Sequence, residues 1–384
     1  MIHFNNAGAG LMPKPVVDAM TNYLRVEAEL GGYEAAAAHR SEIEDFYAAT
    51  STLLGCEPRN VAFTTSATDA YARALSAIPF ERGDVILTTR NDYISNQIAF
   101  LSLRKRFGVE VVHAPDVEEG GVDVDALARL MRERQPRLVA VTHIPTNSGL
   151  VQPVAEIGAC CRERDLLYLV DACQSAGQLA LDVKEIGCDF LSATSRKFLR
   201  GPRGGGLLYV SDRALAAGYE PLFLDMRGAR WTGFEEYEPL ETARRFEDWE
   251  FSYATVVGAA TAIRYALAIG LDEIAERATA LGASLRKALA AVDGVRVLDR
   301  GRELCAIVTI DTPAADDLHD ELERRGINTS VSELQHARYD FADKRVDAAL
   351  RLSPHYYNTE AEIDEVVAAI GELTREHGRA LHVS

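Results

Sequence analysis

Between about residues 50 and 210, short apolar runs alternate with amphipathic segments. The short runs are VAFTT, DVILTT, VEVVHA, RLVAVTH, LLYLVD, DFLSATS and GGLLYV. Most of them are separated by segments with a helical spacing of apolar residues, such as VDVDALARLMRERQ and VAEIGACCRERD. Apolar strands that alternate with amphipathic helices indicate βα units, in which helices cover both faces of a parallel sheet. We therefore predict an α/β fold with a mainly parallel seven-stranded sheet and helices on both faces.

The pattern changes after about residue 240. A long helical stretch, interrupted near Gly270, is followed by the strand-like runs VRVLD and CAIVTID, the helix AADDLHDELERRG and a terminal helix. At the start of that last helix Thr359 precedes Glu362 by three residues, which is the spacing of a capping box. We expect an N-terminal segment over residues 1–15 that packs on the small domain, a large domain over residues 16–240, and a smaller α+β domain over residues 241–384 with a long connecting helix.

Charge and composition exclude several classes of function. The formal net charge of −17 argues against nucleic acid or anionic lipid as a partner, because both require clustered Lys and Arg. No apolar run reaches the roughly 20 residues of a membrane span, and the N-terminus lacks the pattern of a signal peptide. The six cysteines have no metal-ligand spacing, so no metal site is expected. A cytoplasmic protein is the expectation.

Polar residues follow several of the predicted strands. LLYLV ends on Asp171, VAFTT runs into a Ser and Thr cluster that opens a helix, and DFLSATS runs into Lys197. Hydroxylated turns at helix N-termini suit phosphate, a carboxylate can pair with a protonated ring nitrogen, and a desolvated lysine attacks aldehydes. Each feature alone has a plain structural explanation as a cap, a turn or a surface residue. Their coincidence at successive strand ends favours pyridoxal 5'-phosphate (PLP) as cofactor.

A family resemblance supports this interpretation. DACQSAG, followed about twenty residues later by TSRKFLRGPRGGGLLYV, resembles the class V aminotransferase family of fold-type I PLP-dependent enzymes. The branch includes cysteine desulfurases, isopenicillin N epimerase-like proteins and the C–S lyases of ergothioneine biosynthesis. The resemblance extends from FNNAGAG to LRLSPHYYNTEAEID. It implies the PLP-dependent transferase fold type I, a small amino acid as substrate, and a homodimer with active sites near the subunit interface.

The resemblance also implies roles for residues around the cofactor ring. Lys197 would form the Schiff base with PLP and serve as the general base. Asp171 would keep the pyridine nitrogen protonated, and Gln174 would contact the phenolic oxygen. Cys173 would lie against one ring face, and Tyr93 stands where desulfurases have a ring-stacking histidine.

Phosphate and substrate contacts are implied in the same way. Ala67 and Thr68 would bind the phosphate with help from Thr194 and Arg196, where Arg196 replaces the family's more frequent histidine. Arg351 matches the arginine that binds the substrate α-carboxylate, a role that suits a guanidinium fork. The remaining substrate-site candidates are Asn6, Ala7 and Gly8 of the N-terminal segment, and Thr146 and Asn147, between which the resemblance does not choose.

The reaction is less constrained than the cofactor. The region GINTSVSELQHARYDFADKRVDAALRLS contains no cysteine, and desulfurases need a nucleophilic cysteine there, so a cysteine desulfurase is not expected. The segment EAELGGYEAAAAHR resembles the corresponding stretch of the ergothioneine lyases. This favours a C–S lyase that acts by β-elimination on a cysteine conjugate or its sulfoxide. The purely structural explanation of the same segment is a helix with a glycine break. Aminotransferase and amino-acid epimerase are alternatives. A non-catalytic, regulatory PLP-binding relative is an alternative of another class, although Lys197 and Asp171 are both present.

Overall fold

A seven-stranded sheet forms the centre of the chain. The computed structural model describes the backbone of residues 1–381 and the side chains of residues 1–376. The strands, in spatial order, are β2 (Val61–Thr64), β8 (Gly206–Val210), β7 (Phe190–Thr194), β6 (Leu167–Asp171), β5 (Leu138–Thr142), β3 (Val85–Thr88) and β4 (Glu110–His113). β8 alone runs in the opposite direction to the other six strands of this sheet. The predicted α/β class is confirmed, and each strand falls on one of the seven apolar runs.

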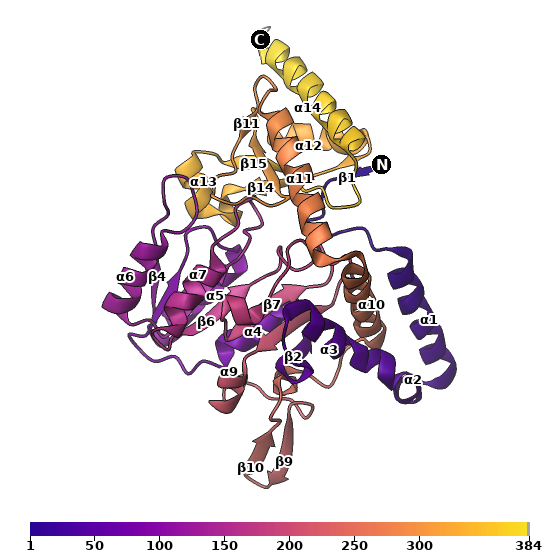
Figure 1. The fold of residues 1–384 in the computed structure, drawn as a ribbon, viewed down its shortest axis with the longest axis vertical. Coiled ribbons are helices and arrows are strands. Elements are labelled where there is room, and N and C mark those ends of the chain that lie inside the picture. Colours follow the sequence, from indigo (N-terminus) through magenta and orange to yellow (C-terminus); the bar gives the residue numbers. More distant parts are fainter. Residues whose placement is uncertain (382–384) are drawn as a thin grey trace.

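Helices cover both faces of this sheet (Figure 1). Alternate residues of β5 show the arrangement, because Val139 and Val141 join one buried cluster whereas Leu138 and Ala140 join the other. On the first face pack α3 (Arg40–Leu54), α6 (Val124–Arg134), α7 (Val154–Arg162), α8 (Val183–Ile186) and α10 (Tyr253–Ile269). On the second face pack α4 (Ala67–Ser76), α5 (Ile94–Phe107) and α9 (Asp212–Ala216). Outside α10 lies α1 (Lys14–Leu30), followed by α2 (Gly32–Ala38).

A second, four-stranded antiparallel sheet lies toward the C-terminal end of the molecule (Figure 1). Its order is β11 (Arg296–Val297), β12 (Val308–Asp311), β15 (Ala348–Leu352), β14 (Ser330–Glu333). The accompanying helices are α11 (Leu271–Leu289), α12 (Ala315–Arg324), α13 (Arg338–Lys344) and α14 (Glu360–Leu381). The N-terminal strand β1 (Ile2–His3) pairs in parallel with β13 (Ile327–Asn328). The domain limits at residues 15 and 240 stay a prediction.

Two local predictions for this part of the chain are confirmed. The long helical stretch breaks at Gly270, whose φ of +106° favours glycine, so that α10 ends and α11 begins there. The capping box at the start of α14 is formed, because the Thr359 hydroxyl accepts from the Glu362 backbone N–H at 3.2 Å and the Glu362 carboxylate accepts from the Thr359 N–H at 2.8 Å. No described helix is by itself long and apolar enough to cross a membrane; α10 and α11 pass that test only together, across a bend of 82°.

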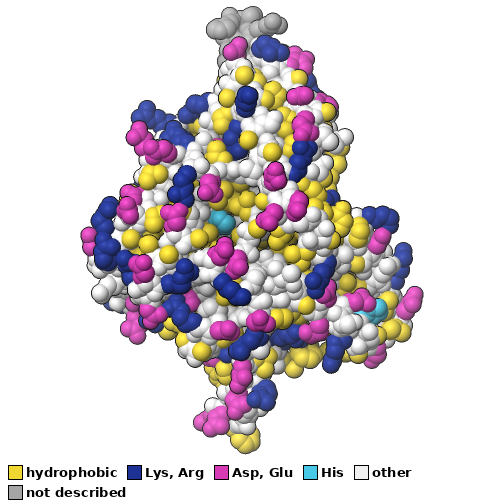
Figure 2. Space-filling view, viewed as in Figure 1, with side chains coloured by type: hydrophobic (Ala, Val, Ile, Leu, Met, Phe, Trp, Pro, Cys, Tyr) yellow, Lys and Arg dark blue, Asp and Glu magenta, His cyan; other side chains and the backbone are white. Residues whose placement is uncertain are grey.

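A hairpin projects from the opposite end of the molecule to α14 (Figure 1). It consists of β9 (Ala229–Gly233) and β10 (Glu236–Pro239), and it carries the exposed aromatic residues Trp231 and Phe234. The short helices η1 (Pro58–Asn60), η2 (Ala243–Phe246) and η3 (Leu334–His336) complete the elements. Figure 2 shows acidic and basic side chains interspersed over the visible face, without a continuous basic patch.

Candidate active site

A cavity opens at the carboxyl ends of the parallel strands. Its walls come from the segments that follow β2, β3, β5, β6 and β7, as expected for a ligand site in an α/β sheet. The lining residues are Ser66, Ala67, Thr68, Tyr93, Thr142, Ile144, Thr146, Asp171, Cys173, Gln174, Thr194, Arg196 and Lys197. Ten of these thirteen are residues that the sequence analysis singled out, so the fold brings together side chains from five separate segments.

Lys197 lies three residues after β7 and is 7% exposed. Its Nζ is 5.9 Å from the centroid of the Tyr93 ring. Burial lowers the pKa of the Lys197 amine, Cys173 and Asp171 oppose that shift, and the nearby guanidinium groups of Arg196 and Arg351 add to it. A lowered pKa increases the fraction of neutral amine, which is the nucleophilic form.

Asp171 ends β6 at the bottom of the cavity and is 4% exposed. Its Oδ2 accepts a hydrogen bond from Asn96 Nδ2 at 3.0 Å, and its Oδ1 accepts from the Cys173 backbone N–H at 2.9 Å. These donors fix the carboxylate plane and leave acceptor capacity on both oxygens. The group is therefore oriented to accept from a protonated ring nitrogen.

Asp92 lies behind Asp171 and was not singled out by the sequence analysis. Its Oδ1 accepts from the Tyr93 backbone N–H at 2.7 Å, from Asn96 Nδ2 at 3.2 Å and from the Thr142 hydroxyl, while its Oδ2 accepts from Gln97 Nε2 at 2.7 Å. Asn96 thus bridges Asp92 and Asp171. Burial raises the pKa of Asp92 to about 6, although the hydrogen bonds oppose the shift. The polar Asp-x-x-x-Asn spacing at the start of α5 was the available sequence signal.

The first turn of α4 forms another wall, where Ala67 and Thr68 line the cavity. Ser66 caps the helix by accepting from the Asp69 N–H at 3.1 Å. Gly206 of β8 lies so close that a Cβ there would be 2.4 Å from the Ser66 carbonyl carbon. The small residue lets β8 pass the helix N-terminus, whose free N–H groups and dipole suit a phosphate.

Gln174, Thr146 and Arg351 form a connected group at the side of the cavity nearer the second sheet. Gln174 Nε2 donates to the Thr146 hydroxyl at 2.8 Å and to the Ala7 carbonyl at 3.1 Å. Arg351 Nη1 donates to the carbonyl and the hydroxyl of Thr146, both at 2.9 Å. Gln174 Oε1 and Arg351 Nε are buried without a partner in the described structure, which suits a ligand that supplies polar atoms.

Arg351 extends from β15 and is a buried cation. Burial lowers its pKa to about 10, and Arg196 contributes to the shift. Within the described side chains no carboxylate lies within 4.0 Å of its guanidinium. An uncompensated buried charge is costly, so the arrangement favours an incoming anion.

The N-terminal segment reaches this side of the cavity mainly through its backbone. The Ala7 carbonyl contacts Gln174 and the Gly8 carbonyl accepts from Arg196. The Asn6 side chain instead donates to the Ser353 carbonyl at 2.8 Å and accepts from the Tyr357 hydroxyl. Asn5, which the sequence analysis passed over, accepts from Arg351 Nη2 at 3.1 Å.

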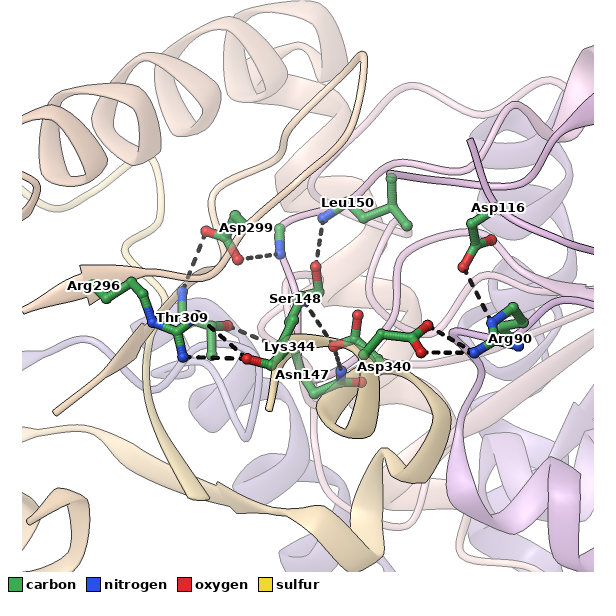
Figure 3. Close-up of polar contacts among 12 residues, drawn as sticks. Arg90, Asp116, Asn147, Ser148, Leu150, Arg296, Asp299, Thr309, Asp340 and Lys344 are labelled. Carbon is green, nitrogen blue, oxygen red and sulfur yellow. Dashed lines mark hydrogen bonds and ion pairs between the residues drawn. The ribbon is translucent and has the colours of Figure 1, made fainter. Parts of the chain in front are cut away.

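Asn147 is directed away from the cavity, unlike its neighbour Thr146. Its amide donates to Asp340 at 2.9 Å, and Lys344 of α13 donates to the same carboxylate oxygen at 2.8 Å (Figure 3). Arg90 forms a bidentate ion pair with Asp343 of α13 at 2.7 and 2.9 Å. These contacts hold α13 against the loop that follows β5 and against the end of β3.

Cys173 is the one cysteine among those described that lines the cavity. Burial raises the pKa of its thiol, and Asp171 adds to the shift, so the thiol stays protonated near neutral pH. Cys305, the cysteine nearest in sequence to the region expected to carry a nucleophile, is fully buried in a separate apolar cluster.

The residues present fit PLP. A carboxylate, a desolvated lysine, an aromatic ring and a helix N-terminus surround one cavity, which matches the pyridine nitrogen, aldehyde, ring and phosphate of that cofactor. The unpartnered polar atoms of Gln174 and Arg351 add independent support.

Comparison with known proteins gives a consistent result. The chain matches the family described as "Aminotransferase class-V" over residues 2–366. It is 30% identical to a "Probable cysteine desulfurase" of Xylella fastidiosa (strain Temecula1), covering 96% of this chain and 90% of that protein. It is also 30% identical to a "Probable hercynylcysteine sulfoxide lyase" of Mycobacterium tuberculosis, with 97% and 90% covered. The apo structure of a cysteine desulfurase from Thermococcus onnurineus NA1 superposes with a TM-score of 0.89 at 25% identity, covering 98% of this chain and 95% of that one.

Proposed function

Because the chain belongs to the class V aminotransferase family and is therefore a PLP-dependent enzyme, we propose that it cleaves the carbon–sulfur bond of cysteine or a close relative of cysteine. The observation that carries the proposal is the set of relatives, which are named for carbon–sulfur chemistry over nearly the full length of the chain. The cavity supports it, because its groups suit an α-amino acid bound beside PLP.

This proposal corrects the expectation drawn from the sequence. The sequence analysis excluded a cysteine desulfurase and preferred β-elimination from a cysteine conjugate or its sulfoxide. That prediction is wrong, since the relatives include several proteins named cysteine desulfurase. The exclusion rested on one missing cysteine between Gly326 and Ser353. That reasoning required the sulfur-accepting thiol to come from one stretch of this chain, although an added small thiol can accept sulfur as well.

Each polar group of the cavity has a distinct task in this proposal. When bound, PLP supplies an electron sink for the bonds at the substrate Cα. Lys197 would hold the cofactor aldehyde and would take the proton from the substrate Cα, a role supported by its lowered pKa. Asp171 would accept the hydrogen bond of the pyridine N–H, Tyr93 would contact the cofactor ring, and Arg351 would bind the α-carboxylate.

The sulfur acceptor is proposed to be an external thiol. Cys173 lines the cavity, but burial beside Asp171 raises the pKa of its thiol, and a protonated thiol is a poor nucleophile. In the proposed step the carbon–sulfur bond breaks, the sulfur passes to the external thiolate as a persulfide, and the substrate carbon gains a proton. A second thiol then releases sulfide and forms a disulfide.

Product analysis tests the proposal. The PLP-loaded protein is incubated with L-cysteine and excess dithiothreitol, and alanine, sulfide, pyruvate and ammonia are quantified. Equal amounts of alanine and sulfide are expected, abolished by Lys197→Ala and retained by Cys173→Ala. Pyruvate with ammonia in place of alanine would contradict the proposal, and so would conversion of the cofactor to its pyridoxamine form without sulfide release.

We further propose that the enzyme is a cytoplasmic homodimer. The large apolar side chains exposed on the hairpin, Trp231 at 81% and Phe234 at 100%, support an interface between subunits. The six cysteines are all free thiols, which supports a reducing compartment.

A further inference from the structure

A second buried carboxylate, Asp92, lies behind Asp171 and is 4% exposed. Its two oxygens accept hydrogen bonds from five groups, which are the Tyr93 backbone N–H, Asn96 Nδ2, Gln97 Nε2 and the hydroxyls of Thr88 and Thr142. So many donors favour the ionised carboxylate, since a protonated one would present its own O–H to groups that need acceptors. Burial opposes this and raises the pKa of Asp92 to about 6, so the group still carries a negative charge near neutral pH.

The amide of Asn96 joins Asp92 to Asp171. Its Nδ2 donates to Asp92 Oδ1 at 3.2 Å and to Asp171 Oδ2 at 3.0 Å. Asp171 also raises the pKa of Asp92, which indicates that the two negative charges interact. Within the described side chains, neither carboxylate has a Lys, Arg or His nitrogen within 4.0 Å. Two buried like charges without a cation are unfavourable, so the pair favours a positive charge beside Asp171.

Only one of the two carboxylates is accessible from the cavity, because Asp171 lines it whereas Asp92 does not. Two explanations of Asp92 differ in what they require. As a structural group, it would satisfy donors at the start of α5, and an uncharged acceptor would serve nearly as well. As an electrostatic group, it would act through its charge, because charges interact over several ångströms in a protein interior. A charge with no cation of its own, bridged to the one carboxylate that faces the ligand, favours the second explanation.

We propose that Asp92 is a second anion for the pyridine nitrogen of PLP, and that its charge, positioned behind Asp171 by Asn96, keeps the proton on that nitrogen. Asp92 is a positioning residue in this assignment, since it does not touch the cofactor. The inference rests on PLP as the cofactor and not on carbon–sulfur cleavage. It adds a group outside the cavity to those that determine how strongly the ring withdraws electrons.

Competition between PLP and its 1-deaza analogue tests the assignment. In the analogue a C–H group replaces the pyridine nitrogen, while the aldehyde and the phosphate are retained. The PLP-loaded protein is equilibrated with the analogue, and the displaced PLP gives the ratio of the two dissociation constants. The unmodified protein should prefer PLP, and Asp92→Asn should lower that preference at least about tenfold, the equivalent of about one pKa unit at the ring nitrogen. A purely structural role would weaken both compounds alike and leave the ratio unchanged.

Asp116→Asn is the matched control, because it removes a partly buried carboxylate whose pKa is also raised. Asp116 pairs with Arg90, so its substitution should change the preference less than about twofold. Asp92→Glu keeps the charge and should retain more of the preference than Asp92→Asn. If Asp92→Asn does not fold, as judged by circular dichroism, Asp92→Ser replaces it with the same expectation, since serine is also uncharged.

Three results would overturn the assignment: no preference for PLP in the unmodified protein, an unchanged preference in Asp92→Asn, or an equal fall in Asp116→Asn. An unchanged preference with weaker binding of both compounds would leave Asp92 as a structural group of α5 alone. Neither compound is an amino acid, so a failed product assay with the expected preference counts against carbon–sulfur cleavage alone.

Discussion

At the residue scale, the buried carboxyl group of Asp92 makes the free energy of unfolding depend on pH. Burial raises its pKa from 3.8 to about 6 in the folded chain. Between these values the native state binds more protons than the unfolded state, so this group lowers the free energy of unfolding as pH rises from about 4 to 6. A shift of this size corresponds to about 3 kcal/mol.

Asp92→Asn should remove that contribution. Urea unfolding of the cofactor-free protein, measured across this pH range, should show the stability of the variant gaining on that of the unmodified protein as pH rises. Asp116→Asn is a control of the same charge change: the pKa of that carboxyl is also raised by burial, but Asp116 pairs with Arg90 and makes no hydrogen bond to Asn96 or Tyr93 within the described structure. Only Asp92→Asn should also weaken PLP binding, because Asp92 orients Asn96 and Tyr93. Parallel pH profiles for Asp92→Asn and the unmodified protein would contradict this account.

Arg351→Gln tests the carboxylate contact. Loss of a charged hydrogen-bond donor of about 1.5–3 kcal/mol should raise KM for the amino acid by about 10- to 100-fold, with a smaller change in kcat. Stability should not fall by a comparable amount, because the substitution also removes an unpaired buried cation. A variant that lowers kcat at unchanged KM would place Arg351 outside the substrate site.

Residues that act through their position in a motif could be predicted from the sequence, whereas those that act through distant contacts could not. Lys197 and Asp171 follow strands that are recognisable by their apolar runs. Asn5 meets Arg351 across 346 positions of the chain, and no local pattern records that contact. Thr146 and Asn147 illustrate the same limit, because adjacent loop residues point to different sides and only the fold decides which one faces the cavity.

At the element scale, α13 carries a buried ion pair within the helix and an exposed ion pair to Arg90, beyond the end of β3. Lys344 and Asp340 form an ion pair with side chains only 5% and 12% exposed, and Asn147 donates to the same carboxylate (Figure 3). Burial raises the pKa of Asp340, and Lys344 counteracts the shift. Lys344→Met would leave that carboxylate buried without its cation and should destabilise the protein by about 3 kcal/mol.

Asp343→Asn is the matched comparison on the same helix. Its ion pair with Arg90 has side chains 32% and 53% exposed, so its loss should cost less than about 1 kcal/mol. For each variant, the shift in the urea midpoint at an unchanged m value gives the change in the free energy of unfolding. Equal effects of the two substitutions would contradict a larger contribution to stability from the buried ion pair than from the exposed one.

The elements that the sequence predicted well are those whose environment is uniform. Six of the seven strands of the central sheet are buried throughout, so each appears as a continuous apolar run bounded by polar residues, whereas the edge strand β4 is partly exposed. The residues of β9, β10 and α13 contact solvent or a few specific partners and carry no comparable periodicity. Their conformation depends on tertiary contacts, which explains why no strand or helix was predicted there.

At the scale of the whole molecule, the proposed homodimer predicts the mass in solution. Light scattering coupled to size exclusion should give twice the chain mass of 42.0 kDa, about 84 kDa, at micromolar concentration. A mass of one chain at that concentration would contradict the proposal. Phe234→Ser, on the exposed hairpin, should shift the equilibrium toward the single chain without changing the fold.

The central claim is that the cavity at the carboxyl ends of the parallel strands holds PLP through Lys197. The most direct measurement is reduction of the PLP-loaded protein with borohydride, followed by peptide mass spectrometry to locate the modified lysine. The account predicts a phosphopyridoxyl group on Lys197 alone, and no modification in Lys197→Ala. Modification of a different lysine, such as Lys344, or retention of the label in Lys197→Ala, would contradict it.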